Sequence, residues 1–314
     1  MSDVSPRFVP DQYKIIKQLG SGQTSFVYLA WHPIFGEVAL KLPRPELQHR
    51  PVLWRMFENE VQITLSLNGG HWRSSNIIQA LEGFPTGDKA FLTLEHCPGG
   101  TLDMLLSKDK LDFETATRLI LEVARGLEFA HKQQVLHRDV KPANVMLTNQ
   151  LQAKLADFGT GLFMTERTSE RVGTAFYMAP EIFEGHPPSV QSDVYSLGVL
   201  AYEVLASERP FKGHSYDELM LQHLTSVPVN LKYKRSDISI ELSHVIAQAM
   251  SRDKAKRFNS VTAFISTFEQ VTQEQPEITT GRKARDSAVN SAKNEDEPSK
   301  TRGGFFSWFK KSKN

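Results

Sequence analysis

The sequence HRDVKPANVML at residues 137–147 sets charged and polar side chains directly before an apolar run. Asp139 carries a carboxylate, Lys141 an ammonium and Asn144 an amide, while residues 145–147 read as a buried strand. Taken alone, these residues allow a metal site, a proton-transfer site or a salt bridge at a strand end. Because most charged side chains are solvated, the salt bridge is as good an interpretation as the other two.

A second carboxylate follows a predicted hairpin. Residues 145–156, VMLTNQLQAKLA, hold two apolar segments around a polar turn, and Asp157 then opens the motif Asp-Phe-Gly. A hairpin would bring Asp157 back toward Asn144, where two oxygen ligands suit a hard cation such as Mg²⁺. Asp139 is then free to orient or deprotonate a hydroxyl, and Lys141 to neutralise charge on a transferring group.

A glycine-containing turn and a lysine lie upstream. Residues 20–27, GSGQTSFV, join two predicted strands, and glycines let a backbone lie close over phosphates. Lys41 stands in VALK on the next strand, and Glu60 on the following helix is the expected partner, with Glu58 as the alternative. Each feature is weak alone, but together they supply a cover and a cation for a polyphosphate.

The chain divides into a strand-rich first part and a helical second part. The predicted strands are residues 13–20, 25–32, 37–43, 76–84 and 89–96. The predicted helices are residues 52–67 and, after Thr101, residues 113–134, 192–207, 238–251 and 260–271. Strands first and helices second predict two lobes that meet near residues 96–100.

Two of these helices have a predicted buried face. The first face comprises Val52, Met56, Val61 and Leu65. The second comprises Ala116, Leu119, Ile120, Val123, Leu127 and Ala130.

The composition excludes several classes of protein. Of 314 residues, 40% are hydrophobic and 23% charged, with a net charge of +1, so no bulk attraction to nucleic acid is expected. Cys97 is the single cysteine, which excludes an internal disulfide and suits a reducing compartment. The N-terminus lacks the apolar core of a signal peptide, and no run of about 18 apolar residues exists. We therefore expect a cytoplasmic protein, with peripheral membrane contact as an alternative.

The C-terminal part has a different character. Residues 272–304 are charged and polar and nearly lack large apolar side chains, which predicts a disordered linker. Residues 305–314, FFSWFKKSKN, then bring aromatics beside lysines. This stretch suits docking on a partner protein, contact with an anionic membrane surface, or folding back onto the domain.

Taken in order, these motifs resemble those of a eukaryotic-type (Hanks-type) serine/threonine protein kinase. The likeness covers residues 13–271. Its last sequence motif is Ala-Pro-Glu at 179–181, and the predicted helices after that motif complete it. It implies an α+β, bilobal protein-kinase fold with a small strand-rich N-lobe at 13–95 and a larger helical C-lobe at 99–271. Residues 1–12 would be an N-terminal extension.

The resemblance also implies a role for each matching residue. Asp139 would be the catalytic base, Lys141 would stabilise the γ-phosphate, and Lys41 would hold the α- and β-phosphates while paired with Glu60. Asn144 and Asp157 would bind Mg²⁺, with Mn²⁺ as an alternative. The implied ATP-binding residues are Leu19, Gly20, Gly22, Val27, Ala39, Lys41 and, through their backbones, Glu95 and Cys97, with Leu94 as gatekeeper.

Two structural supports follow from the same resemblance. Glu181 is expected to pair with Arg257, and Asp193 to brace the catalytic loop from a buried helix.

The resemblance further implies protein substrates and a phosphorylation switch. Lys141 and Thr174 match the serine/threonine branch, so the acceptor would be a Ser or Thr hydroxyl. Arg138 would receive a phosphate placed by autophosphorylation on Thr168 or Ser169. A fixed carboxylate at Glu170, as a partial substitute for that phosphate, and a plain solvated acid there are both open.

Two other functions are weighed against this one. A pseudokinase would lack Lys41, Asp139, Asn144 or Asp157, and all are present. A small-molecule kinase would not need the long segment that ends in GTAFYMAPE. Two departures stand out: Ser25 replaces the third loop glycine, and the segment at 68–76 is longer than usual.

Overall fold

A five-stranded antiparallel sheet, in the order β1-β2-β3-β5-β4, forms the first lobe. The computed structural model describes residues 8–70, 73–108, 110–159 and 169–274. The strands are β1 (Lys14–Ser21), β2 (Ser25–His32), β3 (Gly36–Pro43), β4 (Ala80–Phe84) and β5 (Phe91–Glu95). Their β-branched and aromatic runs, broken by turn residues, place each near its predicted position.

The start of β4 differs from the prediction. The strand begins at Ala80, whereas the apolar run begins at Asn76. The reason is a contact with the second lobe: the Ile78 N–H donates to the Leu155 carbonyl at 3.0 Å, and the Leu155 N–H donates to the Asn76 carbonyl at 2.8 Å. These residues therefore use their backbone groups to join the lobes before the chain enters the sheet.

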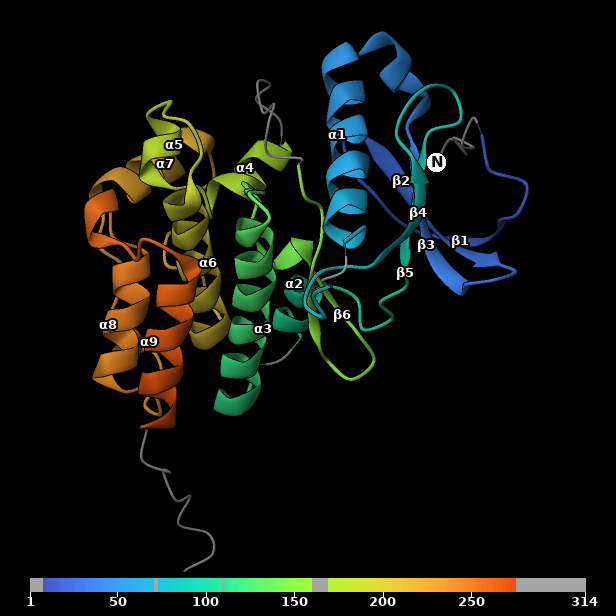
Figure 1. Cartoon of the computed structure of the whole chain (residues 1–314). Helices are drawn as coiled ribbons and strands as arrows, with labels where there is room; N and C mark the ends of the chain where they lie inside the picture. Colours follow the sequence, from blue (N-terminus) through green and yellow to red (C-terminus); the bar gives the residue numbers. More distant parts are fainter. Residues whose placement is uncertain (1–7, 71–72, 109, 160–168, 275–314) are drawn as a thin grey trace, which may run out of the picture. The chain divides into compact units, whose positions relative to one another are not determined.

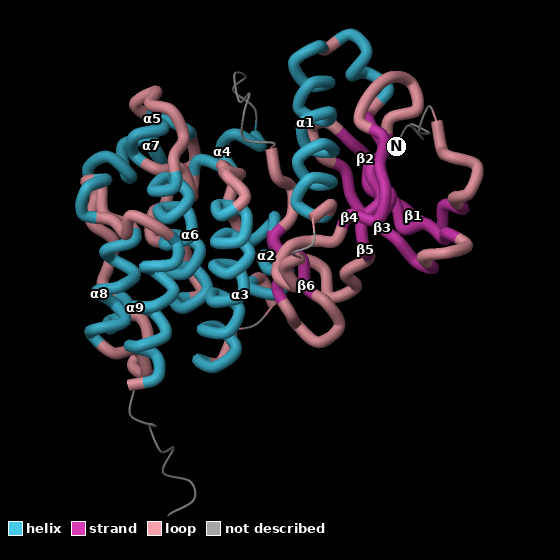
Figure 2. The backbone as a smooth tube through the Cα atoms, in the orientation of Figure 1, coloured by secondary structure: helices cyan, strands magenta, loops and turns pink. Residues whose placement is uncertain are grey.

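Helix α1 (Pro51–Asn68) lies beside the sheet in Figures 1 and 2. Its buried residues are Met56, Phe57, Glu60, Val61, Thr64 and Leu67. The predicted face is therefore wrong in part, because Val52 is 49% exposed and Leu65 is only partly buried. The true face includes the polar Glu60, which an apolar periodicity does not detect.

In the part of the second lobe that the structure describes, the regular elements are helices and one short hairpin (Figure 2). Its elements are α2 (Leu102–Leu106), α3 (Phe113–Lys132), β6 (Val145–Leu147), β7 (Ala153–Leu155), α4 (Ser169–Ala175), α5 (Pro180–Phe183), α6 (Val190–Ala206), α7 (Tyr216–Thr225), α8 (Ile240–Ala249) and α9 (Val261–Gln273). Short 3₁₀ turns span Pro142–Asn144, Leu231–Tyr233 and Lys254–Lys256 in this lobe and Pro45–His49 in the first lobe. The α+β, two-lobe arrangement expected from the sequence is thus confirmed.

Helices α3 and α6 form the centre of this lobe. Helix α3 packs against α6 and α9, and α8 packs against α6 and α9 (Figure 1). All six residues of the predicted α3 stripe are buried. Helix α6 is buried on nearly all sides, as expected for a helix that is apolar all round, and a capping box between Ser189 and Ser192 begins it.

Helix α7 was not predicted. It buries only Leu219 and His223, so its sequence has little apolar periodicity. Its start is defined by the Ser215 side chain, which accepts a hydrogen bond from the Glu218 N–H at 3.2 Å.

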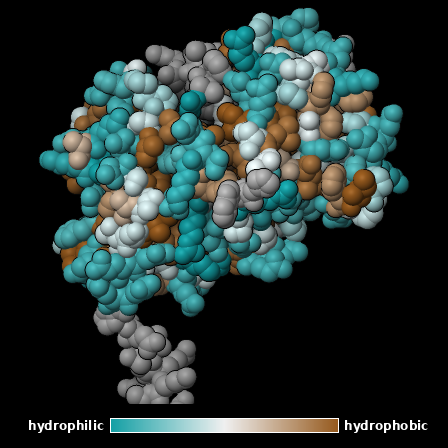
Figure 3. All heavy atoms as spheres, in the orientation of Figure 1, coloured by the Kyte–Doolittle hydropathy of each residue, from teal (hydrophilic) through white to brown (hydrophobic). Residues whose placement is uncertain are grey.

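Hydrophilic residues cover most of the face shown in Figure 3. Within the part of the chain that the structure describes, no helix is both long enough and apolar enough to span a bilayer. The aromatic stretch 305–314 and nearly all of the linker 272–304 lie outside the described residues, so their predicted roles stay predictions.

Gly126 on α3 provides a test of this packing. A Cβ at Gly126 would lie 2.4 Å from the Asn76 carbonyl oxygen, the group that joins the lobes. We expect Gly126→Ala to lower the free energy of unfolding by about 2 kcal/mol through overpacking. The higher helix propensity of alanine, worth about 1 kcal/mol, would not offset this loss.

Gly173→Ala is the matched control, because a Cβ at Gly173 would meet no described atom within 4 Å. Urea unfolding of both variants measures the difference. A Gly126→Ala variant as stable as the Gly173→Ala variant would contradict the close approach of α3 to Asn76.

Candidate active site

Asp139 lies at the centre of a network of polar side chains. The Lys141 ammonium is 2.7 Å from Asp139 Oδ2 and also donates to Thr174 Oγ1 at 2.9 Å. The Thr174 hydroxyl donates to Asp139 Oδ1 at 3.0 Å, and the Asn144 amide donates to Asp139 Oδ2 at 2.9 Å. Asp139 is only 6% exposed, so these donors offset the cost of burying its charge. The arrangement holds the carboxylate in one orientation.

The hairpin of β6 and β7 brings Asn144 and Asp157 together. Val145 lies opposite Leu155 in this hairpin, and the Ala156 N–H donates to the Asn144 backbone carbonyl at 2.9 Å. The Asn144 amide nitrogen makes both side-chain hydrogen bonds to Asp139, so its amide oxygen is the atom suited to a cation. The hairpin predicted from VMLTNQLQAKLA therefore forms and places two oxygen donors at neighbouring positions.

Lys41 extends from β3 to two carboxylates on different elements. Its ammonium is hydrogen-bonded to Glu60 on α1 and lies 3.0 Å from Asp157 Oδ1. Glu58, the alternative partner, instead accepts a hydrogen bond from the indole N–H of Trp54 at 2.8 Å. Lys41 is thus the side chain that connects the sheet, α1 and the Asp-Phe-Gly motif.

Burial and charge act against each other in this triad. Burial acts to lower the pKa of Lys41, but the carboxylates of Asp157 and Glu60 outweigh it and raise the pKa. Burial raises the pKa of Glu60, and Lys41 only partly opposes that effect. Burial also acts to raise the pKa of Asp157, but Lys41 outweighs it and holds the pKa below the ordinary value. Lys41 and Asp157 are therefore the firmly charged members at neutral pH.

His137 connects the two acidic motifs, a role that the sequence did not suggest. Its Nε2–H donates to the Ala156 carbonyl at 2.9 Å, and its Nδ1 accepts the Asp139 N–H at 3.3 Å. A carbonyl can only accept, so Nε2 carries the hydrogen, and Nδ1, which accepts the Asp139 N–H, carries none; the ring is therefore neutral, and burial lowers the pKa of His137 accordingly. The ring also packs 4.6 Å from that of Phe158. The only sequence signal was a histidine inside the opening motif.

Asp193 braces the loop from α6, as expected. Its Oδ2 accepts the His137 N–H and the His131 Nε2–H, both at 2.8 Å, and its Oδ1 accepts the Arg138 N–H at 2.8 Å. Arg138 has a φ of 69° and Asp157 a φ of 63°, left-handed conformations that are uncommon outside glycine. Such conformations persist where surrounding contacts over-determine them, and Asp193 supplies those contacts at Arg138.

Strand register places the glycine-containing turn beside Lys41. Gly20 lies opposite Val27, and Val27 lies opposite Lys41. A Cβ at Gly20 or Gly22 would meet no described atom within 4 Å, so the turn has open space around it. Leu19 lies at an irregularity in the β1–β2 register and is 43% exposed.

The implied adenine-binding residues lie on one side of the sheet and on the chain after it. Ala39 and Leu94 pair across β3 and β5, and Ala39 and Cys97 border the same apolar cluster. Burial, with a smaller effect from the Glu95 carboxylate, raises the pKa of the Cys97 thiol to about 12. Cys97 is therefore a small neutral side chain at this position, not a reactive thiol.

Glu95 has a side-chain contact that the sequence did not suggest. Its carboxylate accepts a hydrogen bond from the Gln79 N–H at 2.7 Å and lies 2.8 Å from the Lys154 ammonium on β7. This ion pair joins the end of β5 to β7 in the second lobe.

The expected switch residues are placed only in part. Thr168 lies outside the described residues, and Ser169 begins α4, where its side chain is not described. The Arg138 Nε is buried and has no hydrogen-bond partner among the residues that the structure describes. Thr174, by contrast, contacts both Asp139 and Lys141.

Glu181 and Arg257 form the expected pair at the end of residues 157–181, the stretch from Asp-Phe-Gly to Ala-Pro-Glu that is called the activation segment below. Two hydrogen bonds of 2.7 Å join the carboxylate to the guanidinium, which also lies 4.8 Å from the centroid of the Tyr195 ring. Burial acts to raise the pKa of Glu181, but the hydrogen bonds from Arg257 outweigh it and hold the pKa below the ordinary value.

The donors at this site fit a divalent cation bound together with phosphates. No cluster of three or more His, Cys, Asp or Glu side chains that could hold a metal occurs in the described ranges. An amide oxygen of Asn144 and a carboxylate of Asp157 match Mg²⁺, which takes few protein ligands and completes its shell with phosphate oxygens and water.

Comparison with known proteins agrees with this geometry. Residues 13–273 match the model of the protein kinase domain. The chain belongs to the protein kinase family. The chain resembles serine/threonine-protein kinase PknB of Mycolicibacterium smegmatis, with 32% identity over 82% of this chain and 42% of that protein.

Two further relatives show the same relation. A probable serine/threonine-protein kinase of Clostridium perfringens is 28% identical over 88% of this chain and 41% of the relative. A probable serine/threonine-protein kinase of Streptomyces coelicolor is 31% identical over 86% of this chain and 41% of the relative. The chain therefore spans less than half the length of these relatives.

The pair of Glu181 and Arg257 predicts a dependence of stability on pH. Because the Glu181 carboxyl has a lower pKa in the folded state, its contribution is present above pH 4.5 and is lost as pH falls through the folded pKa. Glu181→Gln should lower the free energy of unfolding by about 3 kcal/mol at neutral pH, since it leaves Arg257 buried without its partner.

Urea unfolding at neutral pH and at several values below pH 4.5 measures this difference. The difference in the free energy of unfolding between the wild type and Glu181→Gln should become smaller as pH falls. Glu241→Gln, which removes an exposed acid at the start of α8, is the control and should show a small gap at neutral pH. A gap for Glu181→Gln that is constant with pH would show that the carboxylate is not bound as described.

Proposed function

We propose that this chain is an ATP-dependent protein kinase that transfers the γ-phosphoryl group of Mg·ATP to Ser or Thr hydroxyls of proteins. The observation that carries the proposal is the position of Lys41. Its ammonium on β3 contacts Glu60 on α1 and Asp157 in the Asp-Phe-Gly motif, so three separate segments meet there. A lysine held in this way can bind phosphates without losing its charge. The family match and the names of the relatives support the same reaction.

The turn between β1 and β2, with Gly20 and Gly22, would cover the phosphates, and Lys41 would bind the α- and β-phosphates. The adenine would lie against Val27 and Ala39. Its edge would bond the carbonyl of Glu95 and the N–H of Cys97, because the N–H of Glu95 already donates to Gln79 at 2.9 Å and the carbonyl of Cys97 accepts from Gly100 at 3.3 Å.

Asn144 and Asp157 would hold Mg²⁺. The ion, when bound, neutralises charge on the β- and γ-phosphates. Lys41 would then exchange part of its contact with Asp157 for phosphate oxygens while keeping Glu60. The raised pKa of Lys41 keeps it cationic for this purpose.

Asp139 would accept the proton of the substrate hydroxyl, and the contacts of its carboxylate orient it for that step. Lys141, 2.7 Å from Asp139, would stabilise charge on the transferring phosphoryl group. Thr174 supports a Ser or Thr acceptor, because its hydroxyl bonds both Asp139 and Lys141 and so shapes the place where the acceptor must enter. Most of the rate enhancement would come from positioning and charge stabilisation.

Phosphorylation of the activation segment is the second part of the proposal. The buried Nε of Arg138, without a partner among the described residues, is a donor suited to a phosphate. Autophosphorylation at Thr168 or Ser169 would add about −1.5 to −2 charge within this segment. A phosphate docked on Arg138 would act directly beside Asp139.

A pseudokinase remains the alternative that the experiment must exclude. All four residues that it would lack are present, and each makes a side-chain hydrogen bond to another of the four, Lys41 to Asp157 and Asn144 to Asp139. The geometry therefore favours catalysis over nucleotide binding alone.

Asp139→Asn gives the direct test. The wild type incubated with Mg·ATP and a Ser/Thr-containing protein substrate should incorporate phosphate, and the variant should do so at least about 10²-fold more slowly, since it lacks the base. Nucleotide affinity should stay close to that of the wild type. Phosphate mapping should find Thr168 or Ser169 modified in the wild type alone.

The outcomes separate the alternatives. Nucleotide binding without phosphate transfer by the wild type would establish a pseudokinase and refute the proposed reaction. Transfer without modification at Thr168 or Ser169 would refute only the autophosphorylation step.

A further inference from the structure

Arg44 follows β3 and contacts the glycine-containing turn at three points. Its Nε donates to the Gly22 carbonyl at 2.7 Å, and its backbone N–H donates to the Thr24 carbonyl at 3.0 Å. Its guanidinium lies 4.4 Å from the centroid of the Phe26 ring, within reach of a cation–π interaction. A single residue outside the turn thus binds alternate residues along it.

These contacts fix the direction of backbone donors. A trans peptide is planar, so its C=O and the following N–H point in opposite directions. Because the Arg44 Nε holds the carbonyl of Gly22, the N–H of Gln23 points away from the Arg44 side chain. The bond from the Arg44 N–H to the Thr24 carbonyl continues the pairing of β2 with β3 and fixes the end of the turn. The Gly22 N–H donates to the Ser25 carbonyl at 2.8 Å and closes the turn. The turn therefore presents the N–H of Gln23, which is only partly buried, as a donor suited to a phosphate oxygen.

The turn needs such support, because glycine loses more backbone entropy on ordering than any other residue. A Cβ at Gly20 or Gly22 would have open space among the described residues, so side-chain packing does not hold this backbone. Ser25, where the third glycine is replaced, is 1% exposed and anchors the far side of the turn. Arg44 supplies the restraint at Gly22.

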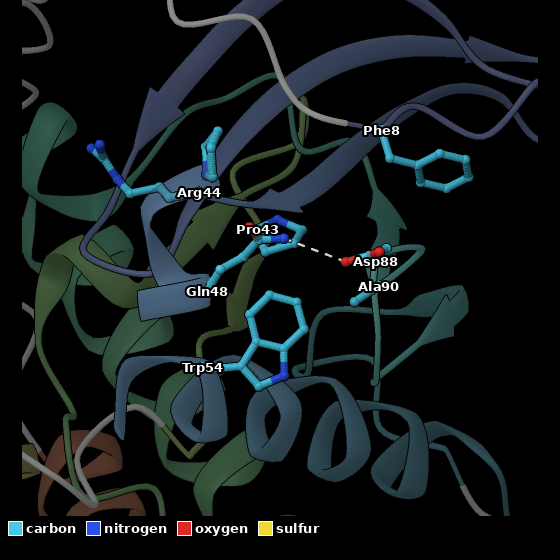
Figure 4. Close-up of a pocket in the computed structure, with 8 residues that line it drawn as sticks. Phe8, Pro43, Arg44, Gln48, Trp54, Asp88 and Ala90 are labelled. Carbon is cyan, nitrogen blue, oxygen red and sulfur yellow. Dashed lines mark hydrogen bonds between the residues drawn. The ribbon is translucent and has the colours of Figure 1, made fainter. Parts of the chain in front are cut away.

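Arg44 helps to line a neighbouring hollow together with Pro43, Gln48 and Trp54, but Figure 4 shows its guanidinium pointing away from the other lining residues. Asp88, the acid in this hollow, accepts a hydrogen bond from Gln48 at 3.4 Å, and the Arg44 nitrogens lie on the other side. The guanidinium is therefore directed to the turn and not to this nearby acid.

We propose that Arg44 is a positioning residue for the nucleotide phosphates. It holds the turn between β1 and β2 so that the N–H of Gln23 is oriented before ATP binds. This inference rests on the proposed function, because it assigns the phosphates of ATP to the same turn. Arg44 acts through the backbone, and so its effect depends on the phosphates and not on the adenine.

The test compares Arg44→Met and Arg44→Lys in the full chain, with binding of Mg·ATP, Mg·ADP and adenosine measured by calorimetry. Methionine keeps the apolar stem but loses the donor, so the Kd for Mg·ATP should rise about tenfold, the worth of one charged hydrogen bond. Lysine keeps the charge without the Nε geometry and should give an intermediate rise. The Kd for adenosine should stay within about twofold of the wild type, because adenosine carries no phosphate for the turn to bind.

Arg125→Met is the matched control. Arg125 lies on α3, is half exposed and pairs with Glu269 at 2.7 Å, so its loss should leave all three affinities unchanged. A Kd for Mg·ATP in Arg44→Met that equals the wild-type value would overturn the inference. So would an equal loss of adenosine affinity, which would indicate general damage to the lobe. Failure of the wild type to bind any of the three ligands would overturn both this inference and the proposed function.

Discussion

A buried lysine needs an opposite charge, and this requirement at Lys41 organises the whole site. Lys41 is 7% exposed and Glu60 is 1% exposed, so neither charge is solvated to any useful degree. An isolated buried charge is costly, which favours a fold in which β3, α1 and Asp157 come together. Because Asp157 follows the hairpin of the second lobe, the same contact also joins the lobes at the place where phosphates would bind. Stability and catalytic geometry therefore depend on one set of atoms.

The second lobe distributes its buried charges differently. Asp193 accepts hydrogen bonds from the backbone N–H groups of His137 and Arg138 and from a ring N–H of His131. Glu181 and Arg257 form a bidentate pair at the end of the activation segment. The contacts of Asp193 hold the backbone of His137 and Arg138, and the pair of Glu181 and Arg257 holds the end of the activation segment. Asp193 lies on the buried helix α6, and Arg257 donates to the Gln191 carbonyl on the same helix. A rigid helix thus supports the parts of the site that have irregular backbone, as preorganised catalysis requires.

Periodicity and turn residues predicted most of the fold. The β-branched runs located β1 to β3 closely, and the apolar stripe of α3 proved to be buried in full. Tertiary contacts account for the failures. Residues at the start of the predicted fourth strand bond to Leu155 instead, and α7 depends on a serine cap more than on an apolar face.

The site was predictable where residues form sequence motifs and not where they act through contacts between motifs. The pairs Lys41–Glu60 and Glu181–Arg257 could be expected because their motifs imply them. The link from His137 to Ala156, the ion pair of Glu95 with Lys154, and the contacts of Arg44 could not, because each joins segments whose distance is set only by the folded chain. No local pattern marks a side chain that orients a carbonyl elsewhere.

The central claim is that Lys41 and Glu60 stabilise each other inside the fold, and a double-mutant cycle tests it most directly. Free energies of unfolding would be measured for the wild type, Lys41→Met, Glu60→Gln and the double variant. Lys41→Met leaves Glu60 buried without its cation, and Glu60→Gln leaves Lys41 with one of its two carboxylates, so the double variant should be more stable than the sum of the single losses implies, with a coupling energy of about 2 kcal/mol. Losses that add to within about 0.5 kcal/mol would show that the two residues do not interact, and would contradict the account.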